Sequence, residues 1–183
     1  MLVLASKSPR RQELLYLLTT EFEIDVSNVD EPAFSGGDVA DYVRELASIK
    51  ARSVARRRPG DTVLGADTVV AFGGEVLGKP ESREHAKQML MSMSGGVQKV
   101  YTGVCIIRGG CEYTDAVCTE VIFRKLSENE VDEYVATGEC MDKAGAYGIQ
   151  GGAGEFVAHI AGDYFNVIGL PMKRVSEMLE EIR

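Results

Sequence analysis

Apolar and polar positions alternate along several short segments of the chain in the manner of strands. The clearest case is 69–77, where two such runs flank Gly73-Gly74 and predict a tight hairpin. A longer hairpin is expected around Gly109-Gly110. Strands are expected at 1–5, 22–26, 62–65, 69–77, 99–108, 112–125 and 156–160.

Between these strands, apolar residues recur every three or four positions, the spacing of helices. The segment 9–18 follows Ser8, a candidate N-cap, and its four leucines are expected to face the core. Asp38 is expected to cap a second helix, and a capping-box sequence opens another at Ser127. Helices are expected at 9–18, 38–57, 82–95, 127–138 and from 171 onward.

Strands and helices are mixed rather than strictly alternating, and hairpins join several of the strands. The pattern therefore predicts an α/β fold with a mixed sheet rather than a doubly wound parallel one. No linker, repeat or low-complexity tract interrupts the sequence, so one domain over 1–183 is expected, with two lobes compatible with the pattern.

Composition narrows the class of protein. The 183 residues carry a formal charge of -8, which argues against a general nucleic-acid binder because phosphate-backbone affinity needs a basic face. No apolar run is long enough for a membrane helix, and the N-terminus does not have the order of a secretory signal. The four cysteines form no metal-binding or redox spacing, so a cytoplasmic protein with reduced thiols is expected.

The charge is unevenly distributed. Residues 1–60 hold nine basic and nine acidic side chains, so the whole acidic excess lies after residue 60. In the balanced part, Ser6 to Arg11 joins a strand to a helix whose free N–H groups attract anions. Arg10 and Arg11 oppose the helix dipole there unless they bind a phosphate or reach sideways to acidic residues such as Glu13.

Three further positions are candidates for chemistry. Lys50 lies on the apolar stripe of its helix, so it either snorkels to solvent or lines an anion pocket. Asp67 lies among apolar strand residues and needs a partner, either as the cap of a turn or as a metal ligand or general base. Glu31 offers a second carboxylate.

Two loops complete the set. Lys79 is held between a glycine and a proline directly after the first hairpin. The glycine-rich segment 141–151 permits close backbone approach to a ligand, and Gln150 within it can read the edge of a base; a flexible connector is the alternative.

Four motifs together resemble the Maf family of nucleotide pyrophosphatases, and the resemblance extends through Gly169-Leu170-Pro171 to cover nearly the whole chain. Each motif alone is weak, whereas their combination in this order is highly specific. The motifs are Leu4-Ala5-Ser6-Lys7-Ser8-Pro9-Arg10-Arg11-Gln12-Glu13-Leu14-Leu15, Gly65-Ala66-Asp67-Thr68, Gly78-Lys79-Pro80 and Asp142-Lys143-Ala144-Gly145-Ala146-Tyr147-Gly148-Ile149-Gln150-Gly151.

This resemblance implies a two-lobed α/β fold related to the inosine-triphosphate pyrophosphatases, with the active cleft between the lobes. It implies hydrolysis of nucleoside triphosphates to monophosphate and pyrophosphate with a divalent metal, Mg²⁺ or Mn²⁺. The residues of the second and fourth motifs are similar to those of the family branch that prefers dTTP and UTP. The implied roles are Asp67 as proton acceptor, Arg10, Thr68 and Gln150 as specificity residues, Ser6, Arg11, Lys50 and Lys79 as phosphate contacts, and Glu31 with Asp67 as metal carboxylates.

Two other classes of function remain as alternatives. A nucleotide-sensing regulator of cell division (septum formation) would use the same pocket without turnover, although a sensor does not need the carboxylate base. An RNA-binding module is disfavoured by the acidic charge and the lack of an aromatic stacking motif. The expected ligand is thus a small nucleotide, and neither a nucleic-acid polymer nor a membrane is expected as a partner. The expected role of the protein is to remove unwanted nucleotides from the nucleotide pool. Family analogy makes a homodimer plausible.

Overall fold

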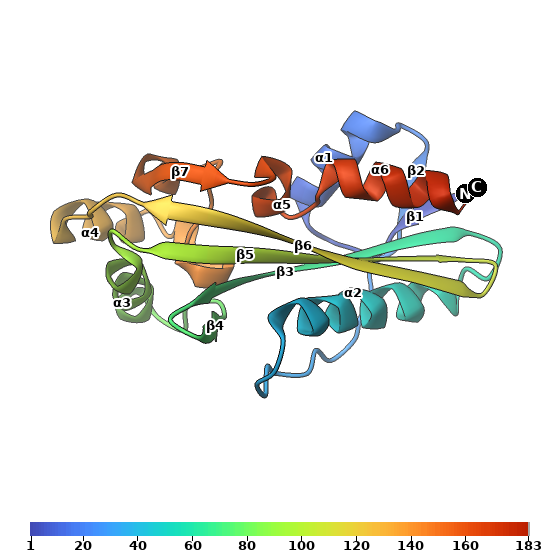
Figure 1. Ribbon diagram of the computed structural model, residues 1–183, viewed down its shortest axis with the longest axis horizontal. Helices are drawn as coiled ribbons and strands as arrows, with labels where there is room; N and C mark the ends of the chain where they lie inside the picture. The colour runs from blue at the N-terminus through green and yellow to red at the C-terminus, as the bar shows by residue number, and fades with distance from the viewer. Residues whose placement is uncertain (183) are drawn as a thin grey trace. The chain divides into compact units, whose positions relative to one another are not determined.

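A mixed sheet organises the chain, which a computed structural model describes over residues 1–182 (Figure 1). In these residues seven strands pair in the order β2-β1-β3-β5-β6-β7, with β4 added to β3. The β1 pairings with β2 and β3 are parallel, whereas the β3–β4 and β6–β7 pairings are antiparallel, so the predicted mixed sheet is confirmed. The strands are β1 Leu2–Leu4, β2 Phe22–Ile24, β3 Thr62–Phe72, β4 Glu75–Leu77, β5 Val97–Arg108, β6 Cys111–Phe123 and β7 Val157–Ala161.

The backbone divides into two units, and the three longest strands contribute residues to both. Of the described residues, the first unit holds 1–68, 101–117 and 165–182, and the second holds 69–100 and 118–164. None of the helices described within 1–182 has the length and apolar character that crossing a membrane would need. The helices are α1 Pro9–Leu18, α2 Val39–Ala55, α3 Arg83–Met93, α4 Glu128–Ala136, α5 Tyr164–Ile168 and α6 Met172–Glu181.

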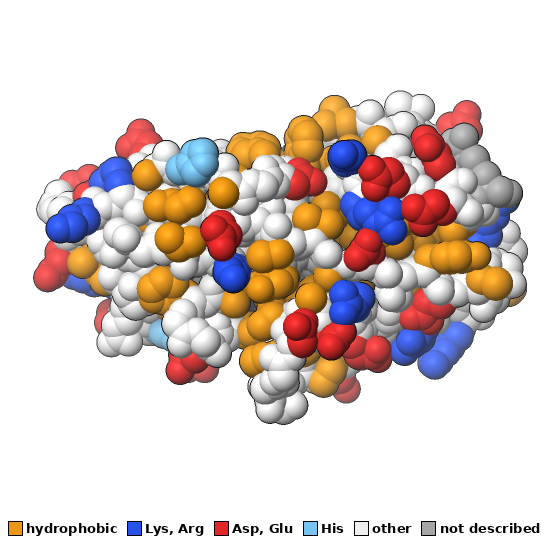
Figure 2. All heavy atoms as spheres, in the orientation of Figure 1, with side chains coloured by type: hydrophobic (Ala, Val, Ile, Leu, Met, Phe, Trp, Pro, Cys, Tyr) orange, Lys and Arg blue, Asp and Glu red, His pale blue; other side chains and the backbone are white. Residues whose placement is uncertain are grey.

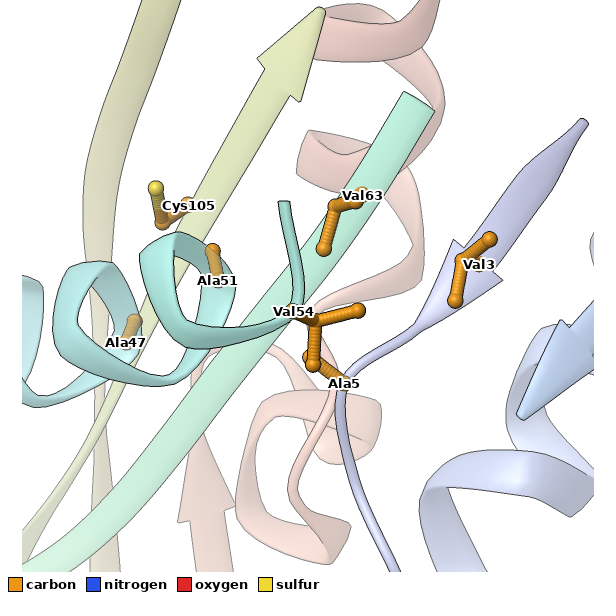
Figure 3. Close-up of a cluster of buried hydrophobic side chains, with 7 residues drawn as sticks. All are labelled: Val3, Ala5, Ala47, Ala51, Val54, Val63 and Cys105. Carbon is orange, nitrogen blue, oxygen red and sulfur yellow. The ribbon is translucent and has the colours of Figure 1, made fainter. Parts of the chain in front are cut away.

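In the first unit, α2 covers one face of the strands, while α1 and α6 lie on the other (Figure 1). Asp38 caps α2 as predicted, since its carboxylate accepts from the backbone N–H groups of Ala40 and Asp41. The buried stripe of α2 packs against the strands in the cluster drawn in Figure 3. That cluster consists of Val3, Ala5, Ala47, Ala51, Val54, Val63 and Cys105.

Two glycines let α2 approach the sheet closely. A Cβ atom on Gly103 would lie 2.1 Å from the carbonyl oxygen of Val43, and one on Gly65 would lie 2.4 Å from that of Ala47. Both distances are shorter than any non-bonded contact, so a larger residue at either position would push the helix away. The absence of these two side chains therefore fixes the height of α2 above β3 and β5.

The prediction for the leucines of α1 is only half right. Leu14 and Leu15 are buried, but Leu17 is 70% exposed and Leu18 is 37% exposed. With 100° between successive residues, the four leucines span about 160° of the helix circumference. The face of α1 that packs against the rest of the first unit is narrower than that.

The second unit follows its local sequence signals closely. Ser127 and Glu130 form the predicted capping box of α4, and Gly138 takes the left-handed conformation at its end. The glycine-rich segment is not an open loop but three short 3-10 turns, η1 Glu139–Asp142, η2 Ala144–Ala146 and η3 Gly152–Phe156. Aromatic rings of this unit pack edge to face in a cluster of Phe123, Tyr134, Tyr147 and Phe156.

Candidate active site

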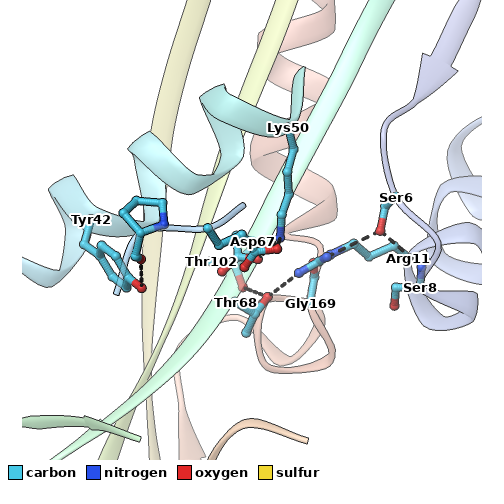
Figure 4. A network of polar contacts seen from close by, with 11 residues as sticks. Ser6, Ser8, Arg11, Tyr42, Lys50, Asp67, Thr68, Thr102 and Gly169 are labelled. Carbon is cyan, nitrogen blue, oxygen red and sulfur yellow. Dashed lines mark hydrogen bonds and ion pairs between the residues drawn. The ribbon is translucent and has the colours of Figure 1, made fainter. Parts of the chain in front are cut away.

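Asp67 lies in the middle of β3, so its predicted alternative role as the cap of a turn is wrong. The residue is only 8% exposed, and a buried carboxylate needs a cation or hydrogen-bond donors to offset its lost hydration. The Lys50 ammonium group supplies that partner by direct contact with Asp67 Oδ1 (Figure 4). Since the two residues are 17 positions apart, the height of α2 above β3 determines whether this pair can form.

Lys50 bridges two carboxylates. Its Nζ atom also lies 2.9 Å from Glu31 Oε1, and its side chain is 12% exposed. The snorkelling alternative is therefore wrong, because the ammonium group ends in a partly buried ion pair rather than in solvent. Its predicted phosphate contact stays a prediction. Glu31, at 48% exposure, forms the open side of this group.

Tyr42 holds the segment that carries Glu31. Its hydroxyl donates to the carbonyl oxygen of Pro32 at 2.9 Å, and its ring lies 5.1 Å from that of Phe34. Burial raises the pKa of Tyr42, and the negative charges of Asp67 and Glu31 raise it further. Sequence analysis did not single out Tyr42 as a candidate, and only its hydroxyl group could have indicated a polar contact.

On the other side of β3, Arg11 is surrounded by neutral oxygens (Figure 4). Its Nε donates to the Gly169 carbonyl at 2.8 Å, its Nη2 to Thr68 Oγ1 at 2.9 Å, and its Nη1 to Ser6 Oγ at 3.4 Å. Burial lowers the pKa of Arg11; the charges of Asp67 and Glu31 oppose this, and Arg10 adds to it. Among residues 1–182, no carboxylate forms a direct ion pair with this guanidinium. A partly buried cation whose hydrogen-bond partners are all neutral can still bind an anionic ligand.

The start of α1 adds to this anion-favouring environment. Ser8 has the N-cap position but its side chain makes no capping bond; instead its N–H donates to Ser6 Oγ at 3.2 Å. The first turn contains no acidic residue, and the proposed sideways ion pair with Glu13 is absent from the described part of the chain. The free N–H groups of the helix and two arginines thus share one end of α1.

Gly169 can present its carbonyl to Arg11 because it has a φ of +127°, a conformation that other residues rarely adopt. A Cβ there would also lie 3.4 Å from Thr68 Oγ1 and 3.7 Å from Arg11 Nε. Gly169 follows α5, a helix of five residues that the sequence did not predict because so short a segment carries too little periodicity.

Thr68 belongs to a chain of hydrogen bonds that sequence reasoning missed. Its hydroxyl lies 2.9 Å from that of Thr102 on β5, and the Thr102 hydroxyl donates to the Asn166 carbonyl at 2.9 Å. Thr102 and Asn166 are both fully buried. No local pattern could have paired them, because they are 64 positions apart.

The remaining predicted residues, Lys79 and Gln150, belong to the second unit and are exposed there. The Gly145 N–H donates to the Gly78 carbonyl at 3.0 Å, so the segment bearing Lys79 is tied to the start of the glycine-rich turns that lead to Gln150. Between these turns, Ala146 has a φ of +63°, which is uncommon for a residue with a side chain.

Asp67 and Glu31 are the candidates for a metal site. Within 1–182 no cluster of three or more histidine, cysteine or acidic side chains is poised to bind a metal ion. Two carboxylates do converge on one cationic group, the Lys50 ammonium. This donor set fits Mg²⁺ or Mn²⁺, which proteins hold through one or two carboxylates while substrate phosphates and water complete the shell.

Comparison with known proteins agrees with the predicted resemblance. A family model described as Maf, Maf-like protein, matches residues 1–182. A dTTP/UTP pyrophosphatase of Thermococcus onnurineus is 52% identical over 180 residues, covering 98% of this chain and 97% of the relative. One from Symbiobacterium thermophilum is 51% identical over 180 residues, covering 98% and 93%.

The fold has a solved counterpart. The Ham1 protein of Staphylococcus aureus matches with a TM-score of 0.57 and 12% identity, covering 100% of this chain and 99% of that one. At this identity the match concerns the fold alone, and it agrees with the mixed α/β architecture predicted from the sequence. With a family model matching nearly every residue and relatives identical at half of their positions, the chain belongs to the Maf-like protein family.

Proposed function

We propose that this chain is a nucleoside triphosphate pyrophosphatase that hydrolyses dTTP and UTP to the monophosphate and pyrophosphate. The observation that carries the proposal is the presence, in one unit, of a buried, ion-paired Asp67 and a partly buried Arg11 whose hydrogen-bond partners are all neutral oxygens. A carboxylate base and an anion site are what phosphoanhydride hydrolysis requires. The names of the relatives above support this substrate class.

In this mechanism Asp67 accepts the proton of the water that attacks the α-phosphorus, and pyrophosphate leaves. Lys50 holds the Asp67 carboxylate in one orientation, because the ammonium group contacts it directly. The water must lie on the side of Asp67 that Lys50 leaves free. A positioned general base contributes about 10²–10⁴-fold to the rate.

Four cations of the chain neutralise phosphate charge in this mechanism. Arg10 and Arg11 act at the start of α1 with Ser6, and Lys50 and Lys79 supply two ammonium groups. Of the five N–H donors of Arg11, three are used within the protein, so two remain for phosphate oxygens. Stabilisation of the charge that develops on the leaving group is usually the largest contribution in such transfers.

Glu31 and Asp67 would hold the divalent metal, Mg²⁺ or Mn²⁺, and the ion would supply positive charge at the phosphates. Lys50 contacts both carboxylates and so keeps these two candidate ligands close to one another.

Arg10, Thr68 and Gln150 select the base. Thymine and uracil share one hydrogen-bonding edge with a donor at N3 and acceptors at O2 and O4, so one set of protein groups can accept both. The Gln150 amide offers a donor and an acceptor for such an edge. This edge distinguishes both bases from cytosine, whose N3 carries no hydrogen.

In this proposal the enzyme acts in the cytoplasm and removes unwanted small nucleotides from the nucleotide pool. It assembles as a homodimer. Basic and acidic side chains are interspersed on the face drawn in Figure 2, which supports a small ligand rather than a nucleic-acid polymer.

The test is pyrophosphate release from dTTP, UTP, CTP, ATP and GTP, each with and without Mg²⁺ or Mn²⁺. We expect metal-dependent release that is fastest with dTTP and UTP. Tight binding of the same nucleotides without release would contradict the proposal and favour the sensor alternative. Release that is equal for all five nucleotides would contradict the base selection alone.

A further inference from the structure

The hydroxyl of Thr102 has only one hydrogen, and the structure shows where it goes. Thr102 Oγ1 lies 2.9 Å from the Asn166 carbonyl oxygen, which can only accept. Thr102 must therefore donate to Asn166. Its other close contact, the Thr68 hydroxyl at 2.9 Å, can then only donate to Thr102.

The same reasoning fixes the Thr68 hydroxyl. Its one hydrogen points to Thr102, and it accepts an N–H from Arg11 Nη2 at 2.9 Å. One lone pair on the oxygen remains. Thr68 is only partly buried, and it directly follows Asp67 on β3. Any ligand group that reaches this hydroxyl therefore meets an acceptor and never a donor.

We propose that Thr102 is a positioning residue that holds the Thr68 hydroxyl as a hydrogen-bond acceptor and thereby makes the site prefer bases with a hydrogen on N3. The inference rests on the proposed function, in which Thr68 contacts the base. Uracil and thymine have a single ring donor, N3–H, so this is the group that an acceptor-only Thr68 can bind. Cytosine would place the lone pair of its N3 against the lone pair of Thr68.

The Thr68 hydroxyl is held rigidly because each residue that it contacts is buried or is fixed by further hydrogen bonds. Thr102 and Asn166 have no exposed surface, and Arg11 is held by Gly169 as well as by Thr68. A free threonine hydroxyl can rotate to suit either a donor or an acceptor. Here the rotation is removed before the substrate arrives, which is what discrimination by one hydrogen bond requires.

The test compares kcat/KM for UTP and CTP in the wild type and in Thr102→Val, which has nearly the same shape without the hydroxyl. The Thr68 hydroxyl would then be free to donate to N3 of cytosine. We expect the UTP-to-CTP ratio to fall about three- to tenfold, the range that one neutral hydrogen bond commands. Thr102→Ser keeps the hydroxyl and should keep the ratio. An unchanged ratio in Thr102→Val, with both nucleotides slowed equally, would overturn the proposal.

Thr68→Val separates this inference from the proposed function. If it lowers the ratio and Thr102→Val adds nothing in the double variant, Thr102 acts through Thr68. An unchanged ratio in Thr68→Val would refute base contact at Thr68 itself, whereas a wild type inactive on UTP would refute the proposed activity. Thr102→Ala removes the same hydroxyl with a smaller side chain and repeats the test if valine prevents folding.

Discussion

Asp67 and Thr68 are neighbours on β3, yet their surroundings differ in how charge is balanced. Around Asp67, Lys50 and Glu31 complete an ion-paired group within the protein. Around Thr68, the charge of Arg11 meets only hydroxyl and carbonyl oxygens. Because Arg11 keeps two N–H donors free, an anion gains hydrogen bonds at Arg11 that the ion-paired group around Asp67 does not offer. The comparison separates a side prepared for proton transfer from a side prepared for anion binding.

The largest effect should come from Asp67→Asn, which keeps the shape and removes the charge. We expect turnover of dTTP to fall about 10²–10⁴-fold while nucleotide binding is largely kept, because the anion-binding side is untouched. Pyrophosphate release and calorimetric binding of a non-hydrolysable dTTP analogue measure the two quantities. Asp132→Asn, on the exposed surface of α4, is the matched control. Near-normal turnover in Asp67→Asn would remove the proton-transfer role.

The next effect should come from Arg11→Met, which keeps much of the apolar stem and removes the guanidinium. We expect kcat/KM to fall about 10–100-fold, since a hydrogen bond to a charged group contributes about 1.5–3 kcal/mol. Stabilisation of the protein by added pyrophosphate, measured by thermal unfolding, should also weaken. If the variant only unfolds at a lower temperature and still responds fully to pyrophosphate, then Arg11 is structural and the comparison fails.

Glu31→Gln should have a smaller effect, limited to metal. Replacing one of two candidate ligands should raise the Mn²⁺ concentration for half-maximal activity at least about tenfold, since even partners of metal ligands contribute that much. Saturating Mn²⁺ should restore most of the rate. A metal requirement identical to that of the wild type would place the metal away from Glu31.

The smallest effect concerns Tyr42, whose pKa is raised first by burial and then by Asp67 and Glu31. A raised pKa in the folded state means that its stability contribution is complete below the unfolded pKa of about 10 and is lost as the pH rises beyond it. In the metal-free protein, wild type should therefore lose stability more steeply than Tyr42→Phe as the pH rises above about 10. If the stability of the two proteins changed equally with pH, Tyr42 would not be influenced by the carboxylates of Asp67 and Glu31.

Signals within a few residues of one another predicted much of the fold. The Asp38 cap and the Ser127 capping box are where the sequence placed them, since both are contacts between near neighbours. The outward positions of Leu17 and Leu18 depend on which face of α1 is covered by other elements. A local sequence pattern cannot predict which face of the helix other elements will cover.

The candidate site shows the same limit. Asp67, Lys50, Glu31 and Arg11 could be chosen from residue type and position. The residues that they contact could not be predicted. Lys50 reaches Asp67 only through the packing of α2, and Arg11 hydrogen-bonds to Gly169, which is 158 positions away in the sequence. Thr102 gave no signal, as a threonine inside a strand is ordinary until its hydroxyl is seen between two others.

The close approach of α2 to the sheet has a practical consequence for mutagenesis. Gly65 and Gly103 lie under the helix that carries Lys50, and neither has a side chain that could contact a nucleotide. In a saturation scan scored by catalysis, both positions should nevertheless tolerate almost nothing, because any added carbon lifts the lysine off its carboxylates. Variants that fail there should recover nothing from higher substrate or metal concentrations, which sets them apart from losses at the residues that bind either one.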